Sequence, residues 1–205
     1  MKTLALATLI ALATTAAHAA PVPEGSWLLR ARLINLKPAN DGGHVATLGG
    51  KPQANGDTVP ELDLTYFATP NLAFELIAAT TQHNVRTVKG SNTALGSIRL
   101  LPPTLTAQYH FTHPCLGKFK PYVGAGVTYA HFYDSDHPGL GSVKYDNAWG
   151  TALQAGVDYK LTDKVYLNAD LKKIYVSTDV TVNDTISARA NLNPLVAGLG
   201  IGYRF

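Results

Sequence analysis

The chain has 205 residues, with 17 Lys or Arg against 14 Asp or Glu and a formal net charge of +3, an excess too small to suggest nucleic acid as a partner. Its single cysteine, Cys115, excludes an intramolecular disulfide. Beyond the first 19 residues, no run reaches the roughly 18–20 apolar residues that a membrane helix needs, so membrane residence would require a barrel or surface attachment.

The N-terminus has the features of a secretory signal peptide. Lys2 supplies a positive charge, residues 4–13 are apolar or small, and Ala17-His18-Ala19 is an A-x-A cleavage signal. We therefore expect a signal peptide at 1–19 and one domain at 20–205. The alternative, a retained N-terminal helix, is disfavoured by the shortness of the segment and its Ala and Thr content.

The rest of the chain repeatedly alternates apolar residues with polar or small ones, which is typical of β-strands with one apolar face. In the last segment one face carries Leu195, Ala197, Leu199, Ile201, Tyr203 and Phe205, and the other carries Val196, Gly198, Gly200, Gly202 and Arg204. In chain order, the pattern predicts strands near 26–36, 61–68, 72–81, 101–111, 119–131, 148–160, 165–176 and 195–205.

The connections alternate in length. Short turns are expected at 69–71, 112–118 and 161–164, and long loops at 37–58, 82–97, 132–147 and 177–191. Aromatic residues fall near both ends of the apolar faces, as in the two aromatic girdles of outer-membrane barrels. The sequence thus predicts an all-β fold, an eight-stranded antiparallel transmembrane β-barrel with short periplasmic turns and long extracellular loops. Both termini then lie on the periplasmic side.

Four segments closely resemble the outer membrane protein W (OmpW) family: LPPTLTAQY at 101–109, FKPYVGAG at 119–126, WG with GVDY within 149–159, and GYRF at 202–205. The resemblance covers nearly all of the mature chain. It implies a barrel with a narrow apolar lumen in the outer membrane of a Gram-negative bacterium. Family members are credited with passage of small hydrophobic compounds, and some serve as bacteriocin receptors. The loop at 132–147 looks shorter than in the family, which weakens a loop-borne receptor role.

The inward face predicts a closed floor in the periplasmic half of the barrel. Its charged or titratable residues, which we call the polar plug, are Arg30, Arg32, Asp63, Glu75, His110, Lys120, Asp158, Asp170, Lys172 and Arg204. Buried charges must be paired, and an eight-stranded barrel has room for little besides its own side chains. The plug could serve stability alone, or it could form a polar gate or a narrow ion path.

The inward face becomes apolar in the outer half. The hydrophobic lumen is predicted to include Ile34, Leu36, Ile77, Pro102, Ile174, Val176 and Val196. These residues could bind a small hydrophobic molecule or simply pack against each other. Pro102 and Pro103 lack backbone donors, so they interrupt strand pairing. The interruption could be a lateral exit for the ligand or a bulge that shapes the rim.

Other functions find less support in the sequence. We find no nucleophile elbow or phosphate loop, so we expect neither an enzyme nor a cofactor. His110, His113 and Cys115 are too weak a signal for a metal site. A soluble lipocalin-like carrier would expose its apolar faces to water. A structural or receptor role, with phages, bacteriocins or host surfaces as partners, stays open.

Three further partners are expected. The apolar outer face would contact outer-membrane lipid and lipopolysaccharide. The lumen would hold a small hydrophobic ligand. The C-terminal strand, with Tyr203 and Phe205 at its end, would act as an assembly signal for the barrel-assembly machinery.

Overall fold

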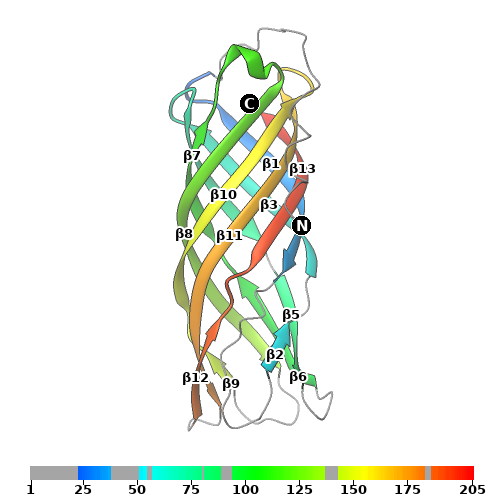
Figure 1. Ribbon diagram of the computed structural model, residues 1–205, viewed down its shortest axis with the longest axis vertical. Helices are drawn as coiled ribbons and strands as arrows, with labels where there is room; N and C mark the ends of the chain where they lie inside the picture. Colours follow the sequence, from blue (N-terminus) through cyan, green and yellow to red (C-terminus); the bar gives the residue numbers. More distant parts are fainter. Residues whose placement is uncertain are drawn as a thin grey trace, which may run out of the picture.

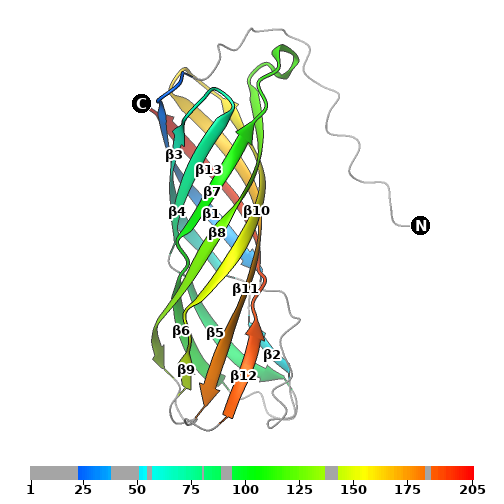
Figure 2. The same ribbon diagram turned by 90° about the vertical axis from the view of Figure 1, so that its left-hand side faces the viewer.

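The computed structural model describes residues 23–37, 51–54, 57–79, 81–88, 94–136, 143–182 and 186–205. The predicted signal peptide lies outside these residues, so it stays a prediction. Two views at right angles show the strands as a tall cylinder (Figures 1 and 2). The three-residue helix η1 (Pro114–Leu116) is the only helix in this part of the chain, where no helix is long and apolar enough to cross a membrane.

Eight antiparallel strands form the wall. They are β1 (Trp27–Lys37), β3 (Asp57–Phe67), β4 (Leu72–Ala79), β7 (Thr104–His110), β8 (Phe119–Asp136), β10 (Ala148–Lys160), β11 (Val165–Val182) and β13 (Leu195–Arg204). The first strand pairs with the last, and β8 pairs with β10, so the sheet closes on itself. Closure pairs the first and last wall strands with each other, as a lipid environment requires. The predicted eight-stranded barrel is confirmed.

Five further strands prolong the wall at its extracellular end, the lower end of Figure 1. They are β2 (Lys51–Ala54), β5 (Thr81–Val88), β6 (Ala94–Leu101), β9 (Val143–Tyr145) and β12 (Ile186–Asn191). β6 pairs with β5 and β8, while β9 and β12 both pair with β11. The prediction of loops at 82–97, 132–147 and 177–191 was therefore wrong over much of their length. Outside the membrane a strand needs no apolar face, so the alternation that marks strands is lost there.

The periplasmic end is closed by short turns and by the two chain ends. The Thr69 hydroxyl accepts from the backbone of Asn71 and Leu72, and the Thr162 hydroxyl does the same for its own turn. Trp27 and Phe205 exchange two backbone hydrogen bonds of 3.1 and 3.0 Å. These bonds fix the N-terminal strand to the C-terminal strand at the rim.

The faces of the wall are inverted relative to a soluble protein. Leu33 is 64% exposed and Leu199 is 69% exposed on the outside, while the side chains of Arg30 and Glu75 are fully buried inside. Such an arrangement is stable only if the outside contacts acyl chains. The predicted direction of the apolar faces is confirmed.

Aromatic side chains mark two levels on the outside. Trp27 packs against Tyr66 near the periplasmic end, with ring centroids 4.8 Å apart, and Trp149 lies 4.9 Å from Tyr129 near the other end. On β10, ten residues separate Trp149 from Tyr159, which packs on a neighbouring ring near the periplasm. At about 3.3 Å per residue and a tilt of about 40°, this separation spans roughly 25 Å along the barrel axis, the height of the apolar band.

Inward-facing glycines make room for large side chains in the lumen. A Cβ at Gly156 would lie 2.4 Å from the ring and hydroxyl of Tyr122, and one at Gly200 would lie 2.6 Å from the Arg32 side chain. Both distances are well inside van der Waals contact. The glycines that alternate with outward apolar residues on β10 and β13 therefore allow bulky polar groups to cross the lumen.

Candidate functional site

Arg30 is at the centre of the polar plug. Its guanidinium lies 2.7 Å from Asp158 Oδ2, 2.9 Å from Asp63 Oδ1 and 3.3 Å from Glu75 Oε1. It also donates to the Thr65 hydroxyl at 2.7 Å. These partners come from β3, β4 and β10, so a single side chain from β1 ties together strands on opposite sides of the lumen.

Arg32, two residues farther along β1, forms the next level. Its guanidinium lies 2.9 Å from Glu61 Oε1, 2.8 Å from Asp63 Oδ2 and 3.0 Å from Glu75 Oε1. Asp63 and Glu75 are therefore shared between the two arginines. Guanidinium groups present several N–H donors in fixed directions, so two of them can face this many carboxylate oxygens. Arg32 Nε and Asp63 Oδ2 take part only in ion pairs and form no hydrogen bond with a described residue.

Lys172 occupies the outermost level and is held more loosely. Its ammonium lies 3.3 Å from the nearer oxygen of Glu61 and 3.7 Å from Asp170. Gln154 donates to both Glu75 and Asp170 at 2.8 Å, and the Tyr122 hydroxyl donates to Asp170 at 2.9 Å. We call this group the charged network: the cations Arg30, Arg32 and Lys172 with the carboxylates Glu61, Asp63, Glu75, Asp158 and Asp170.

A basal layer lies between the charged network and the periplasm. Arg204 is sandwiched between the rings of Phe67 and Tyr166, at 4.7 and 4.4 Å, and donates to the Tyr166 hydroxyl at 2.7 Å. His110 stacks on Tyr122 with ring centroids 4.9 Å apart. Lys120 is buried but forms no ion pair with any described residue.

The structure buries all ten predicted plug residues in the periplasmic half. The two cations of the basal layer, Lys120 and Arg204, offset the excess of five carboxylates over three cations in the charged network. Asn168 was also predicted to face inward, whereas the predicted plug left out other residues that contribute to it: Glu61, Thr65, Phe67, Tyr122, Gln154 and Tyr166. The sequence could have identified them, because each lies an even number of residues from a predicted plug residue on the same strand and therefore faces inward as well.

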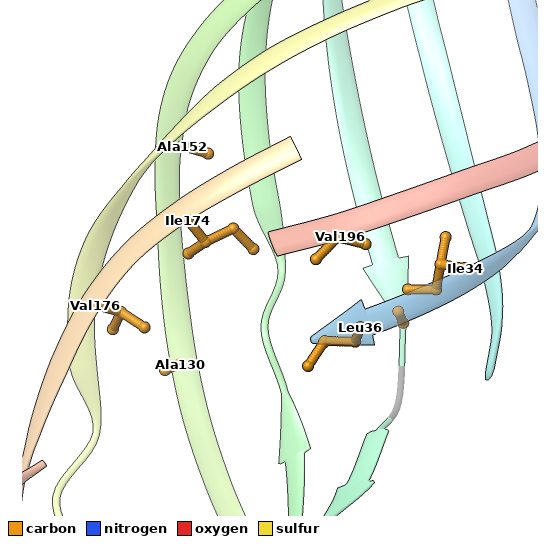
Figure 3. Packing of buried hydrophobic residues seen from close by; sticks show 8 residues of the cluster. Ile34, Leu36, Ala130, Ala152, Ile174, Val176 and Val196 are labelled. Carbon is orange, nitrogen blue, oxygen red and sulfur yellow. The ribbon is translucent and has the colours of Figure 1, made fainter. Parts of the chain in front are cut away.

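A cluster of buried apolar side chains, which we call the apolar chamber, lies on the extracellular side of the plug. It is formed by Ile34, Leu36, Ala79, Ala130, Ala152, Ile174, Val176 and Val196, all buried and drawn from six strands. Figure 3 shows Ile34, Leu36 and Val196 on one side and Ile174 and Val176 on the other. Five of the seven predicted hydrophobic lumen residues meet here. Ile77 is buried outside this cluster and Pro102 is half-buried. Ala79 and Ala130 have the predicted inward direction, whereas Ala152 was not predicted to line the lumen.

The side chains that line the lumen change abruptly from charged to apolar along each strand. On β1, Arg32 is followed on the inward face by Ile34, and on β11, Lys172 is followed by Ile174. One inward step along a strand is about 7 Å. The apolar chamber therefore borders directly on the extracellular side of the charged network. The Lys172–Glu61 pair lies at this boundary.

The wall beside the chamber is interrupted at Pro102 and Pro103. Pairing of β7 with β8 ends at Thr104↔Thr128, and pairing of β6 with β8 resumes at Leu101↔His131. Across the interruption one backbone hydrogen bond is formed, from Tyr129 to the Pro103 carbonyl at 3.0 Å. On the other side, pairing of β4 with β7 ends at Ile77↔Thr104. The break lies at the level where the chamber meets the plug.

Comparisons with known proteins agree with this architecture. Outer membrane protein W of Vibrio cholerae is 34% identical over 215 residues, covering 97% of this chain and 99% of the relative. The outer-membrane protein y4mB of Sinorhizobium fredii is 38% identical over 202 residues, covering 93% and 87%. Among solved structures, OprG from Pseudomonas aeruginosa superposes with a TM-score of 0.81 at 26% identity and covers 89% of this chain and 96% of its own.

The name of a further relative refers to an operon for the metabolism of an aromatic compound. The dibenzothiophene metabolism operon protein PahQ of Pseudomonas aeruginosa is 30% identical over 199 residues, covering 89% of this chain and 90% of the relative. The model of the OmpW family matches residues 23–205, which is the whole barrel. The chain therefore belongs to the OmpW family and is an outer-membrane β-barrel protein.

Proposed function

We propose that the barrel binds a small hydrophobic molecule in the apolar chamber and helps it cross the outer membrane. The chamber itself carries the proposal, because eight buried apolar side chains line the lumen where a water-filled pore would place polar groups. The relative PahQ is named for an operon of dibenzothiophene metabolism, and dibenzothiophene is an apolar tricyclic compound. A ligand of this chemical class suits walls of Ile, Val and Ala.

The path of the ligand follows from the closed floor. The charged network fills the lumen on the periplasmic side of the chamber, so an apolar molecule would have to leave through the wall. We propose the break at Pro102 and Pro103 as a lateral exit, since it has fewer ladder hydrogen bonds than the wall on either side. The competing interpretation is a bulge that only shapes the wall.

Binding can be tested with isosteric substitutions. Val176→Thr and Val196→Thr add one hydroxyl each to the chamber with little change in volume, and Val127→Thr on the lipid-facing side is the matched control. Dibenzothiophene binding to the purified barrel should weaken several-fold in the chamber variants and not in the control. Unchanged binding in the double chamber variant would refute a chamber site.

The exit is tested separately. Pro102→Ala and Pro103→Ala together restore two backbone donors to the wall. Cells with this variant should take up dibenzothiophene more slowly while the purified barrel binds it with the same affinity. Normal uptake would refute the lateral exit and leave the binding proposal intact. Heat-dependent gel mobility checks that the variant barrel is folded.

A structural or receptor role is the second candidate. The observation in its favour is that β8, β11 and their partner strands continue as paired sheet beyond the apolar band. Shortening the β5–β6 hairpin should abolish docking of a phage or bacteriocin but leave dibenzothiophene binding unchanged. The chamber variants should show the reverse pattern.

We also propose that the C-terminal strand is the assembly signal. Tyr203 and Phe205 both face outward, and their side chains are about half exposed. Deletion of Phe205 removes one aromatic residue and the two backbone hydrogen bonds that it exchanges with Trp27. The amount of folded barrel in the outer membrane should fall, while refolding of purified protein in detergent should be less affected. Equal losses in both assays would indicate a purely structural role.

A further inference from the structure

Two lysines interrupt the apolar outside of the barrel. In the described part of the chain, Lys37 and Lys173 are the only lysine or arginine residues that face outward on the eight wall strands. The other basic residues of these strands belong to the polar plug or, like Lys160, lie at the periplasmic rim. A lipid-facing lysine costs about 2–4 kcal/mol at the bilayer midplane and almost nothing near the interface.

The two lysines lie on the same row of the sheet. Leu195 of β13 is the register partner of Lys37 on β1 and of Lys173 on β11. Adjacent strands are about 4.8 Å apart, so the two lysine backbones are roughly 10 Å from each other. Leu195, which is 40% exposed, lies between them. The outward residues next to Lys37 include Asn35, which donates to the Thr58 hydroxyl, while β8 carries Val127 and Tyr129 on its outward face.

Their height places them at the outer headgroups. Lys37 is ten residues from Trp27 on β1, and Lys173 is eight residues from Val165 on β11, both counted from the periplasmic rim. With a rise of about 3.3 Å and a tilt of about 40°, these separations become roughly 25 and 20 Å along the axis, the upper limit of the apolar band. Tyr175, the next outward residue on β11, belongs to the outer aromatic girdle.

Lys173 is held in place by the wall. Its ammonium donates to the Asn193 carbonyl at 2.6 Å and lies 5.9 Å from the centre of the Tyr175 ring. Asn193 has a φ of +31°, the one positive φ of a non-glycine residue in the described chain, and its side chain accepts from the Val176 backbone. No described carboxylate lies within 4.0 Å of Lys173 or Lys37. The pair therefore presents two uncompensated charges, one of them at a fixed position.

We propose that Lys37 and Lys173 form a binding site for the phosphate groups of lipopolysaccharide, the phosphorylated glycolipid of the outer leaflet. Phosphate oxygens at the interface would accept from both ammonium groups, and the acyl chains would pack on Leu195 between them. An ammonium has three donors, and the Asn193 carbonyl uses one of those on Lys173, so donors remain for a phosphate. This site is on the outside of the wall and is independent of the apolar chamber.

The test is lipid binding by the purified barrel. Lys37→Gln and Lys173→Gln remove the charges, and Lys118→Gln, at an exposed periplasmic turn, is the matched control. Affinity for lipopolysaccharide, measured by native mass spectrometry in detergent, should fall about fivefold for each lysine removed and stay unchanged in the control. Enzymatically dephosphorylated lipopolysaccharide should bind the unmodified barrel as weakly as intact lipopolysaccharide binds the double variant.

Two results would overturn the proposal. The first is unchanged affinity in Lys37→Gln, a variant that removes no side-chain hydrogen bond or ion pair to a described residue and should leave the wall intact, as gel mobility can verify. The second is equal binding of phosphatidylglycerol and lipopolysaccharide, which would show that the pair attracts any anionic lipid rather than the phosphorylated glycolipid.

Discussion

Substitution of Arg30 by Met is the most direct test of the charged network. Met keeps most of the aliphatic volume but removes contacts to Asp158, Asp63 and Glu75 at 2.7, 2.9 and 3.3 Å. Removing one partner of a buried ion pair typically costs about 3–5 kcal/mol, because the other charge stays buried without compensation. Since Arg30 contacts three carboxylates and the Thr65 hydroxyl, we expect a loss near the upper end of that range.

The loss can be measured by urea unfolding in lipid vesicles, with tryptophan fluorescence and gel mobility as independent probes. Lys172→Met is the internal comparison, because its contacts of 3.3 and 3.7 Å predict a smaller loss. Adding Asp158→Asn to Arg30→Met should recover part of the stability by removing one uncompensated charge. A loss below about 1 kcal/mol for Arg30→Met, or one equal to that of Lys172→Met, would refute the view that Arg30 organises the plug.

Three further substitutions test the fold. Gly156→Ala places a Cβ 2.4 Å from the Tyr122 ring, so stability in urea should fall by about 1–3 kcal/mol. Tyr122→Phe loses the hydrogen bonds to Asp170 and Asn168, and the same assay should show a loss of about 1–2 kcal/mol. Leu199→Arg puts a charge on the lipid face and should cost about 2–4 kcal/mol in vesicles, whereas an equal stability would mean that Leu199 does not face acyl chains.

The sequence was sufficient for the wall because each wall strand has to separate lipid from lumen. That requirement produces a strict alternation, and the alternation assigns residues such as Arg30 and Leu199 to their faces. The alternation could not locate the extracellular ends of β8 and β11, because outside the membrane the same strands contact water on their outer side. The loops predicted at 132–147 and 177–191 failed for that reason.

The inward direction of the plug residues could be predicted, but not their pairing. Asp63 and Glu75 each contact both arginines, while Lys120 contacts none of the described carboxylates. Pairing depends on which side chains reach across the lumen, and this depends on shear and on the space left by inward glycines such as Gly200. The alternation along one strand determines neither the shear of the barrel nor the space available in the lumen. The lysine pair at Leu195 was hidden for a similar reason, since it requires the register of three strands.

The two proposals about the wall have a geometric consequence when taken together. In the closed order of strands, β13 is followed by β1, β3, β4 and β7, so the break beside β7 lies four of eight strands away from Leu195. The lipopolysaccharide site and the lateral exit are thus on opposite sides of the barrel. A tightly bound glycolipid at the exit would obstruct a ligand leaving the chamber, whereas one bound at Lys37 and Lys173 would not. The apolar outer face at Val127 and Leu105 leaves the lipids beside the exit free to exchange.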